Sequence, residues 1–301
     1  MSAATGPGRI FPLATFISDL PHHLLPRRTD LPPRVGSSST ATHRLLIVGD
    51  VHGMKRSLVA LLDKAGFDRS KGDHLVLVGD VVNKGPDSAA VVDLAIKLGA
   101  SAVRGNHDDA VLRAAAELKA GSDTVSHGEE TRKTAAALST SQLDWLASLP
   151  LMLRIQLPPR PRCSLGNVVV VHAGLVPGTP LEEQDAYAVM HMRSLVVLND
   201  TLSPDEAAGE EGWAVEWDRR QHELASASRE DETMTVIFGH DAKRSLQMGR
   251  YAIGLDSACV YGHRLTGLLL EPTESGLEHR IVQVEAADEQ PPPPSPTVAS
   301  V

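Results

Sequence analysis

Short apolar runs recur along the middle of the chain and are separated by polar turns. "LLIV" before Gly49 and "LVLV" before Gly79 are typical of them. Runs this rich in Val, Leu and Ile, with turn residues at their ends, predict strands that are buried on both faces. The predicted strands are Arg44–Gly49, His74–Gly79, Ala100–Arg104, Asn167–Val171, Met234–Phe238, Tyr251–Leu255, Leu265–Leu270 and His279–Val284.

Between the early strands, apolar residues recur every three or four positions, which indicates amphipathic helices. Strands that alternate with helices predict an α/β domain with parallel strands, and the closely spaced late strands add an antiparallel portion. The charged stretch 203–232 is expected to be an inserted loop or helix. The predicted helices are Arg56–Ala65, Ser88–Leu98, Asp108–Lys119 and Ser141–Ser148.

The two ends of the chain have a different composition from the middle. Residues 1–41 are rich in Pro, Ser and Thr and predict a flexible leader, whereas residues 288–301, with "PPPPSP", predict a disordered Pro-rich tail. The domain is therefore predicted to span residues 42–287. With 301 residues, of which 42% are hydrophobic, the chain can bury one sizeable core.

The net charge of the chain narrows the classes of partner. A formal charge of -9 argues against general nucleic-acid binding and against an anionic membrane surface. No apolar stretch reaches the length of a membrane span. The two cysteines form no CxxC pair, which fits a reducing compartment. We predict a cytoplasmic location, and a vacuole or another organelle stays open.

Five of the predicted strands end in side chains that can bind a metal, each close to a glycine. "GDVHG" follows the first strand, and "GNHD" follows the third. Because ligands collect at the carboxyl ends of strands in an α/β sheet, we expect these side chains to converge. Carboxylate, amide and imidazole groups suit Mn, Fe or Zn, and six of them suit two ions that share a carboxylate. The predicted metal ligands are Asp50, His52, Asp80, Asn106, His172 and His240.

Each of these motifs has an ordinary interpretation when it is taken alone. A single Gly-Asp after a strand is usually a turn, and a single His is usually a core or surface residue. Five such motifs in this order favour a metal site. A phosphoryl group is one kind of substrate that two metals can clamp, and charge that develops on it also needs cations. Arg104, directly before Gly105, and Lys84, in the loop after Asp80, are placed in the sequence to bind and stabilise a phosphoryl group.

Several motifs together resemble a known family. "GDVHG", "GDVVNKGPDS", "RGNHD", "HAG" and "GHD" resemble the signature of calcineurin-like metallophosphoesterases of the phosphoprotein phosphatase superfamily. "LDWLASLPLML", "MHMR" and "GLDSACVYGHRLTGLLL" are more similar to the ApaH-like phosphatase branch, with its symmetrical diadenosine tetraphosphate hydrolases and zinc-dependent endopolyphosphatases. The resemblance covers roughly residues 43 to 272. It implies two mixed β-sheets packed as a sandwich, with helices on the outside.

The resemblance also implies a role for each ligand. It implies two divalent metal ions, which could be Mn, Zn, Fe, Co or Mg. Asp80 would bridge the two ions, and His107, next to Asn106, matches the general acid of the family. By the same resemblance, Asp50 and His52 hold the first ion, while Asn106, His172 and His240 hold the second.

The sequence departs from the wider family at two positions. Asn83 and Lys84 stand where other members have Asp and Arg, and that Asp normally orients the acid histidine. Asn83 can accept a hydrogen bond from His107 but cannot stabilise an imidazolium by charge. Arg193 in "MHMR" is a further candidate for substrate binding, by resemblance to the nucleotide hydrolases.

Trp213 and Trp217 allow two interpretations. They precede an Arg pair, so they could form a lid over the substrate, or they could anchor the inserted segment by packing. Asp256, which follows a predicted strand, is expected to be a structural acid in a turn.

Taken together, these observations predict an enzyme that hydrolyses phosphoanhydrides by a metal-activated hydroxide. The substrate would be inorganic polyphosphate or a dinucleoside polyphosphate, and no general nucleic-acid binding is expected. One alternative is a serine/threonine protein phosphatase, which Asn83 and Lys84 disfavour. Another is a binding module that keeps the fold without metal. The sequence does not choose among the anhydrides or name the metals.

Overall fold

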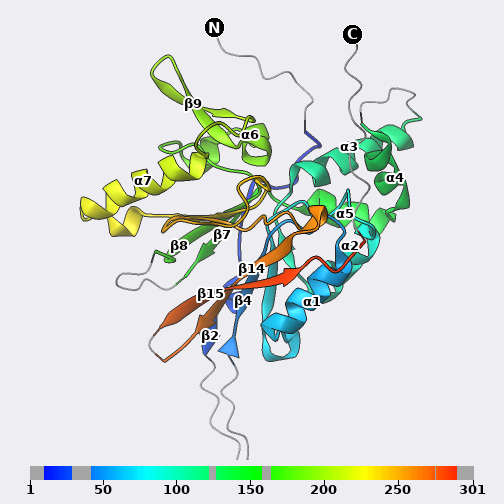
Figure 1. The fold of residues 1–301 in the computed structure, drawn as a ribbon, viewed down its shortest axis with the longest axis horizontal. Coiled ribbons are helices and arrows are strands. Elements are labelled where there is room, and N and C mark those ends of the chain that lie inside the picture. The colour runs from blue at the N-terminus through cyan, green and yellow to red at the C-terminus, as the bar shows by residue number, and fades with distance from the viewer. Residues whose placement is uncertain (1–9, 29–41, 122–126, 158–163, 275, 290–301) are drawn as a thin grey trace, which may run out of the picture.

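Two β-sheets packed face to face form the middle of the computed structural model, which describes residues 10–28, 42–121, 127–157, 164–274 and 276–289 (Figure 1). One sheet has the strand order β15-β14-β4-β5-β6 and the other β1-β7-β8-β11-β13-β12. The first comprises β4 (Leu45–Val48), β5 (His74–Leu77), β6 (Ser101–Ala102), β14 (Arg264–Pro272) and β15 (Leu277–Glu285). The second comprises β1 (Ile17–Asp19), β7 (Met152–Gln156), β8 (Asn167–Val171), β11 (Thr235–Phe238), β12 (Gln247–Met248) and β13 (Ala252–Gly254).

Helices cover the outer face of each sheet, and short hairpins and turns complete the described fold (Figure 1). The α-helices are α1 (Lys55–Ala65), α2 (Ser88–Leu98), α3 (Asn106–Lys119), α4 (Glu129–Ala137), α5 (Thr140–Ser148), α6 (Ala186–His191) and α7 (Trp213–Ser226). Two small antiparallel pairs are β2 (Arg27–Arg28) with β3 (Thr42–His43), and β9 (Ser194–Leu198) with β10 (Thr201–Asp205). Single 3-10 turns are η1 (His22–Leu24), η2 (Arg69–Lys71), η3 (Leu181–Glu183), η4 (Glu230–Glu232) and η5 (Cys259–Tyr261).

The core follows from the two-residue period of the strands. In β4, Leu45 and Ile47 belong to the apolar layer between the sheets, together with residues of β8 and β11. Leu46 and Val48 belong to the layer between this sheet and its helices. Because both faces of each central strand are covered, an apolar run without polar alternation is the sequence that such a strand requires.

The parallel parts of the two sheets position the site. β4, β5 and β6 are parallel in one sheet, and β8, β11 and β13 are parallel in the other. β14 and β15 run antiparallel at the edge of the first sheet. The α/β class, the mixed sandwich and the predicted strands and helices are thus confirmed. The stretch 203–232 contains the end of the β9–β10 hairpin and α7.

The predicted domain limits need correction at both ends. Residues 10–28, assigned to a flexible leader, are ordered, and β1 pairs with β7 in parallel. Asp288, assigned to the tail, is buried and accepts hydrogen bonds from the start of α1. The predicted leader and tail otherwise fall at 1–9, 29–41 and 290–301, outside the described residues.

None of the described helices combines the length and the apolar character that crossing a bilayer requires. The longest described helices have 14 residues, which is shorter than the roughly 20 residues that a span needs.

Candidate metal centre

The six predicted ligands lie together where the carboxyl ends of the two parallel strand sets meet. Two come from the loop after β4 and one each from the ends of β5, β8 and β11, while the sixth begins α3 after β6. All are buried except the half-buried Asn106. We call these six residues, together with His107, the ligand cluster: Asp50, His52, Asp80, Asn106, His107, His172 and His240.

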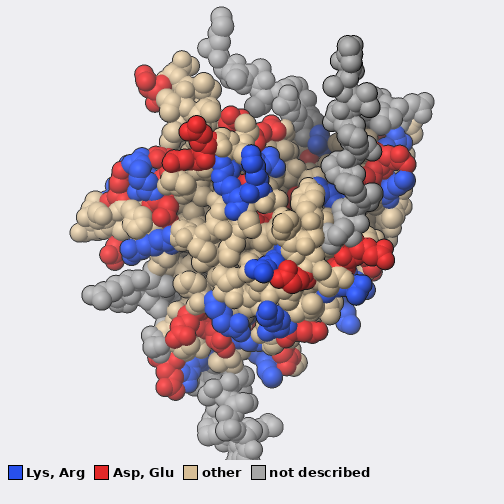
Figure 2. Space-filling view, viewed as in Figure 1, with Lys and Arg blue, Asp and Glu red and all other residues tan. Residues whose placement is uncertain are grey.

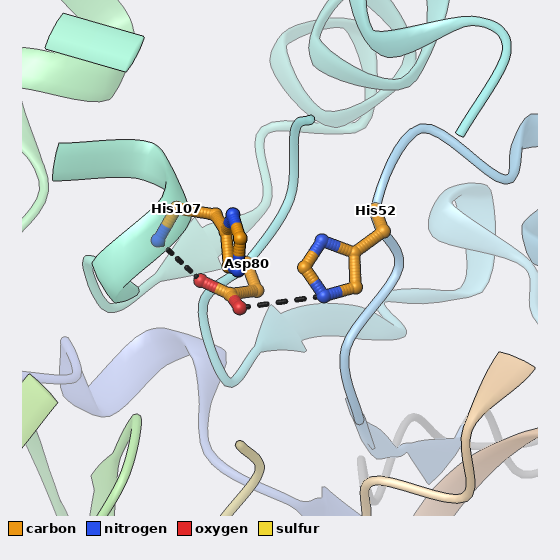
Figure 3. Close-up of side chains that lie close together, drawn as sticks. All are labelled: His52, Asp80 and His107. Atoms are coloured by element: carbon orange, nitrogen blue, oxygen red, sulfur yellow. Dashed lines mark hydrogen bonds and ion pairs between the residues drawn. The ribbon is translucent and has the colours of Figure 1, made fainter. Parts of the chain in front are cut away.

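Asp80 stands between two groups of metal-competent atoms. On one side, His52 Nε2 lies 3.3 Å from Asp80 Oδ2, and the backbone N–H of His107 donates to Asp80 Oδ1 at 2.9 Å (Figure 3). On the other side, His172 Nε2 lies 3.4 Å from Asp80 Oδ1. Asp80, His52 and His107 form one group, and Asp80, His172 and His240 form the other. Within each group, the atoms that could bind a metal lie within 4.8 Å of one another.

Asn106 joins the second group through its amide oxygen. Asn106 Oδ1 lies 2.9 Å from His172 Nε2 and 3.1 Å from His240 Nδ1. These three atoms are of the kinds that bind divalent ions through lone pairs. The predicted neighbourhood of Asn106, His172 and His240 is therefore present in the structure.

The orientation of the histidines tests whether a cation fits here. His52 Nδ1 faces the carbonyl oxygen of Val82 at 3.2 Å, and His172 Nδ1 faces that of Val78 at 3.0 Å. A carbonyl oxygen only accepts, so each of these nitrogens carries the proton, and the Nε2 lone pair points into the cluster. In His240 the two nitrogens exchange roles. Its Nε2 faces the carbonyl oxygen of His191 at 3.1 Å and carries the proton, so the lone pair is on Nδ1. Lone pairs that converge on carboxylate and amide oxygens fit bound cations.

Glycines next to the ligands allow this close packing. A Cβ on Gly105 would collide with the backbone and carboxylate of Asp80, and one on Gly239 would collide with the carboxylate of Asp50. His52, Asp80 and His240 all have positive φ, between 46° and 65°, a conformation that side chains disfavour. The surrounding structure holds these residues in strained positions, as is common at functional sites.

Asp50 is held differently from the other carboxylate. Both of its oxygens accept from the backbone N–H of His240 at 3.1 Å. Burial raises the pKa of Asp50 well above its usual value, and the nearby Asp256 and Asp80 raise it further. The three-residue group around His52 contains His107 rather than Asp50. The structure thus places His107 directly beside the predicted position of the first ion.

Burial also sets the protonation of the imidazoles. It lowers the pKa of His52 and His240 well below the usual value, and it lowers the pKa of His107 to about 4. For Asp80, burial raises the pKa, but the neighbouring His172, His107, His52 and Lys84 outweigh it and lower the pKa. Neutral imidazoles and an ionised Asp80 are the forms in which these groups bind metals.

Asn83 contacts His107, but its amide nitrogen donates the hydrogen bond, whereas the sequence predicted that Asn83 would accept one. Asn83 Nδ2 lies 3.0 Å from His107 Nδ1 and also donates to Thr131 Oγ1 at 3.0 Å. Thr134 Oγ1 donates to Asn83 Oδ1 at 3.4 Å. These partners direct the amide N–H toward His107, so Nδ1 is the accepting nitrogen of a neutral ring.

A cavity of about 440 Å³ opens over the cluster. Lys84 and Arg193, both predicted to bind substrate, line it. Asp256 lines it as well and accepts from the N–H of Ala258 at 2.9 Å, which is the structural turn role expected for it. The cavity also contains side chains that sequence reasoning missed. We call five of the lining residues the rim: Lys84, Arg193, Lys243, Tyr261 and His263.

The prediction that Arg104 binds phosphate is wrong. Its side chain is fully buried and is absent from the cavity lining. The guanidinium donates to the carbonyl oxygens of Phe11 at 2.9 Å and Ala147 at 2.7 Å, and it pairs with Asp109 at 3.4 Å. Arg104 therefore fastens the N-terminal segment to the domain instead of facing the reaction.

The two tryptophans of the inserted segment are packing anchors. Trp213 and Trp217 are both buried. The indole N–H of Trp213 donates to the carbonyl oxygen of Ala173 at 2.9 Å, and that of Trp217 donates to Met234 at 3.1 Å. Trp213 thus braces the chain directly after His172, and the lid interpretation is wrong.

Two face-to-face sheets with a buried carboxylate–imidazole cluster at their strand ends define a metal-dependent hydrolase. The sequence pattern of the calcineurin-like phosphoesterase family matches residues 43–264, so the chain belongs to that family. Divalent metal ions are the cofactors that this family and the cluster imply.

Relatives of known name support the same class. The chain is 28% identical to a protein of Nitrosomonas europaea named bis(5'-nucleosyl)-tetraphosphatase, symmetrical, over 74% of this chain and 94% of the relative. It is 29% identical to a protein of the same name from Aromatoleum aromaticum, over 79% and 96%. A solved structure provisionally assigned as a diadenosine tetraphosphatase aligns with a TM-score of 0.65 and 34% identity, over 90% of this chain and 98% of that one.

Proposed function

We propose that the protein hydrolyses the phosphoanhydride chain of dinucleoside polyphosphates such as diadenosine tetraphosphate, with two divalent ions held by the ligand cluster. The observation that carries the proposal is the convergence of lone pairs from three histidines on Asp80 and Asn106 beneath a cavity with a cationic rim. The names of the relatives support the choice of substrate.

The proposed ligands divide between two positions around Asp80. His52 and Asp50 would hold one ion, His172, His240 and Asn106 the other, and Asp80 both. When bound, two divalent ions supply Lewis acidity and lower the pKa of a water molecule toward neutrality. Mn, Fe, Zn, Co and Mg remain the candidates, because carboxylate, amide and imidazole donors accept all of them.

The other residues would bind, orient and move a proton. Lys84 lies 3.2 Å from His52 Nε2, so its ammonium can pair with a phosphoryl oxygen beside the cluster. Arg193 offers a fork for a second phosphate. His107 would pass a proton to the leaving oxygen, and Asn83 would keep its ring in place.

The contact between His107 and Asn83 favours anhydrides over phosphoserine esters. An amide places no negative charge beside the imidazole, so the protonated acid is not stabilised. A phosphoanhydride has a good leaving group and depends less on that acid. The protein-phosphatase alternative therefore has less support. Basic and acidic side chains are also interspersed on the described part of the face in Figure 2, which offers no broad surface for a nucleic acid.

The test is a substrate panel with the full chain and added Mn, Zn, Co or Mg. The panel contains diadenosine tetraphosphate, long-chain inorganic polyphosphate, capped RNA and a phosphoserine peptide. We expect diadenosine tetraphosphate to give two ADP, the symmetrical products, and we expect activity to vanish after chelation and to return with metal. Turnover of polyphosphate alone would shift the proposal to an endopolyphosphatase. Turnover of the peptide alone, or no turnover of any substrate, would overturn it.

A further inference from the structure

One part of the cavity wall is a turn rather than a strand end. In η5, Cys259 and Val260 are buried, whereas Tyr261 is 54% exposed and lines the cavity. The chain has three Trp, three Tyr and four Phe, all within the described residues, and Tyr261 alone among them is exposed. An aromatic ring at a cavity mouth contributes little to the core and is available to a ligand.

Hydrogen bonds order the backbone of the turn that carries this ring. Ser257 Oγ donates to the carbonyl oxygen of Arg264 at 2.7 Å, which ties the two ends of the turn together. Within the turn, the N–H of Tyr261 donates to the carbonyl oxygen of Ala258 at 3.0 Å. Ala258 and Gly262 both adopt the left-handed conformation on either side of η5. A ligand that uses the ring therefore has little backbone to order.

Lys84 connects the ring to the ligand cluster. Its Nζ lies 5.5 Å from the centroid of the Tyr261 ring and 3.2 Å from His52 Nε2. The ammonium group of Lys84 thus lies between the Tyr261 ring and the ligand cluster. A phosphate that pairs with Lys84 places the next part of a nucleotide substrate beside Tyr261. Lys243 and His263 line the same cavity and add polar contacts for further phosphates or the sugar.

We propose that Tyr261 is the stacking platform of a nucleobase subsite. The inference rests on the proposed function and deepens it, because it states how the site distinguishes dinucleoside polyphosphates from inorganic polyphosphate. A chain of phosphates needs cations and metals but has no flat apolar group to stack. A nucleobase has such a face, and stacking on an aromatic side chain is tolerant of base identity. An exposed tyrosine on an ordered turn, next to cations that can pair with phosphates, matches a substrate that carries a nucleobase.

The experiment compares two ligands rather than two rates. Isothermal titration calorimetry on the full chain with Mn²⁺ measures the Kd of a tetraphosphate and of a diadenosine tetraphosphate analogue, both with methylene bridges in place of the anhydride oxygens. The readout is the ratio of the two affinities. We expect Tyr261→Ala to reduce the preference for the analogue about tenfold, the usual effect of losing one stacked base. Tyr261→Phe keeps the ring and is expected to keep the ratio within about twofold.

Two results would overturn the subsite. The first is an equal loss of affinity for both ligands in Tyr261→Ala, which would mean that the ring only supports Lys84. The second is a wild-type protein that binds both ligands equally. Since neither ligand contains a cleavable anhydride, the result is independent of catalysis. If Tyr261→Ala lowers the ratio but the protein hydrolyses no anhydride, the subsite stands and the proposed function is rejected. If the protein hydrolyses the anhydride but Tyr261→Ala leaves the ratio unchanged, the proposed function stands and the subsite is rejected.

Discussion

Most of the ligand cluster and the whole rim line one cavity, but different parts of the chain hold them. The cluster side chains follow strand ends, are mostly buried, and are fixed by backbone carbonyls such as those of Val82 and Val78. Most rim residues come from loops, from η5 and from the connection before β9, and Tyr261 and His263 are exposed. The strand framework thus positions the chemistry, while the connections carry the contacts that select a substrate.

The largest effect is expected inside the cluster. Asp80→Asn removes the charge that both groups of ligand atoms share, while the volume of the side chain stays the same. We expect kcat/KM for diadenosine tetraphosphate to fall at least about a hundredfold, since even indirect partners of metal ligands cost 10- to 100-fold. Bound metal, measured by plasma mass spectrometry, is expected to fall with it. Asp63→Asn, an exposed site on α1, is the matched control and keeps both.

Arg104 directly precedes the motif that carries Asn106 and His107, and its substitution tests whether it takes part in substrate binding. Arg104→Ala removes a buried cation that pairs with Asp109 and holds Phe11, so we expect the unfolding free energy to fall by about 3 kcal/mol. At a temperature where the variant is folded, KM is expected to stay within about twofold of the wild-type value. Urea unfolding and steady-state kinetics measure the two quantities.

A matched control for that experiment is Arg113→Ala. Arg113 also pairs with Asp109, at 3.1 Å, but its side chain is 30% exposed. We expect it to cost less than about 1 kcal/mol, as partly exposed ion pairs do. If Arg104→Ala raised KM strongly and left stability unchanged, the guanidinium would be a substrate contact after all.

The error over Arg104 shows where sequence reasoning reaches its limit. The apolar runs predicted the strands, and the motifs after them predicted the cluster, because strand order and strand ends determine both. The direction of a side chain next to such a motif depends on tertiary partners. Arg104 has Phe11 and Ala147 as partners, and neither could be paired with it from sequence. The ordered segment around β1 was missed for the same reason.

The rim was harder to predict than the cluster. Lys243 and Tyr261 stand in short connections whose composition does not differ from that of ordinary turns. Their relation to the cluster exists only after β11, β13 and η5 are packed together. Arg193 was found through its resemblance to the nucleotide hydrolases, because periodicity gave no signal there.

A rim charge is expected to have an intermediate effect. Arg193 lines the cavity, and its Nη1 donates to the carbonyl oxygen of Glu206 at 3.2 Å. We expect Arg193→Gln to raise KM for diadenosine tetraphosphate roughly tenfold, the effect of losing one charged hydrogen bond to phosphate. The unfolding free energy is expected to change by less than about 0.5 kcal/mol. Arg220→Gln on α7, outside the cavity lining, controls for net charge; an equal effect there would contradict a local role for Arg193.

The smallest effect is expected where Asp288 caps the start of α1. α1 begins three residues after His52 and has no side-chain cap from its own preceding residue, Met54. Asp288 supplies that cap, because its carboxylate accepts from the N–H of Arg56 and the N–H of Ser57, both at 2.8 Å. We expect Asp288→Ala to lower the unfolding free energy by about 1 kcal/mol, as the loss of a cap does.

Asp288→Asn separates the cap from the charge. An Asn side chain still accepts from one N–H, so we expect it to lose less stability than Asp288→Ala. Both variants leave every cluster and rim side chain in place, so KM for diadenosine tetraphosphate is expected to remain close to the wild-type value. A tenfold loss of Mn²⁺ affinity in Asp288→Ala would instead mean that the helix start holds the His52 loop in its binding position. In that case Asp288 would help to position the ligand cluster, although it lies 236 residues further along the chain than His52.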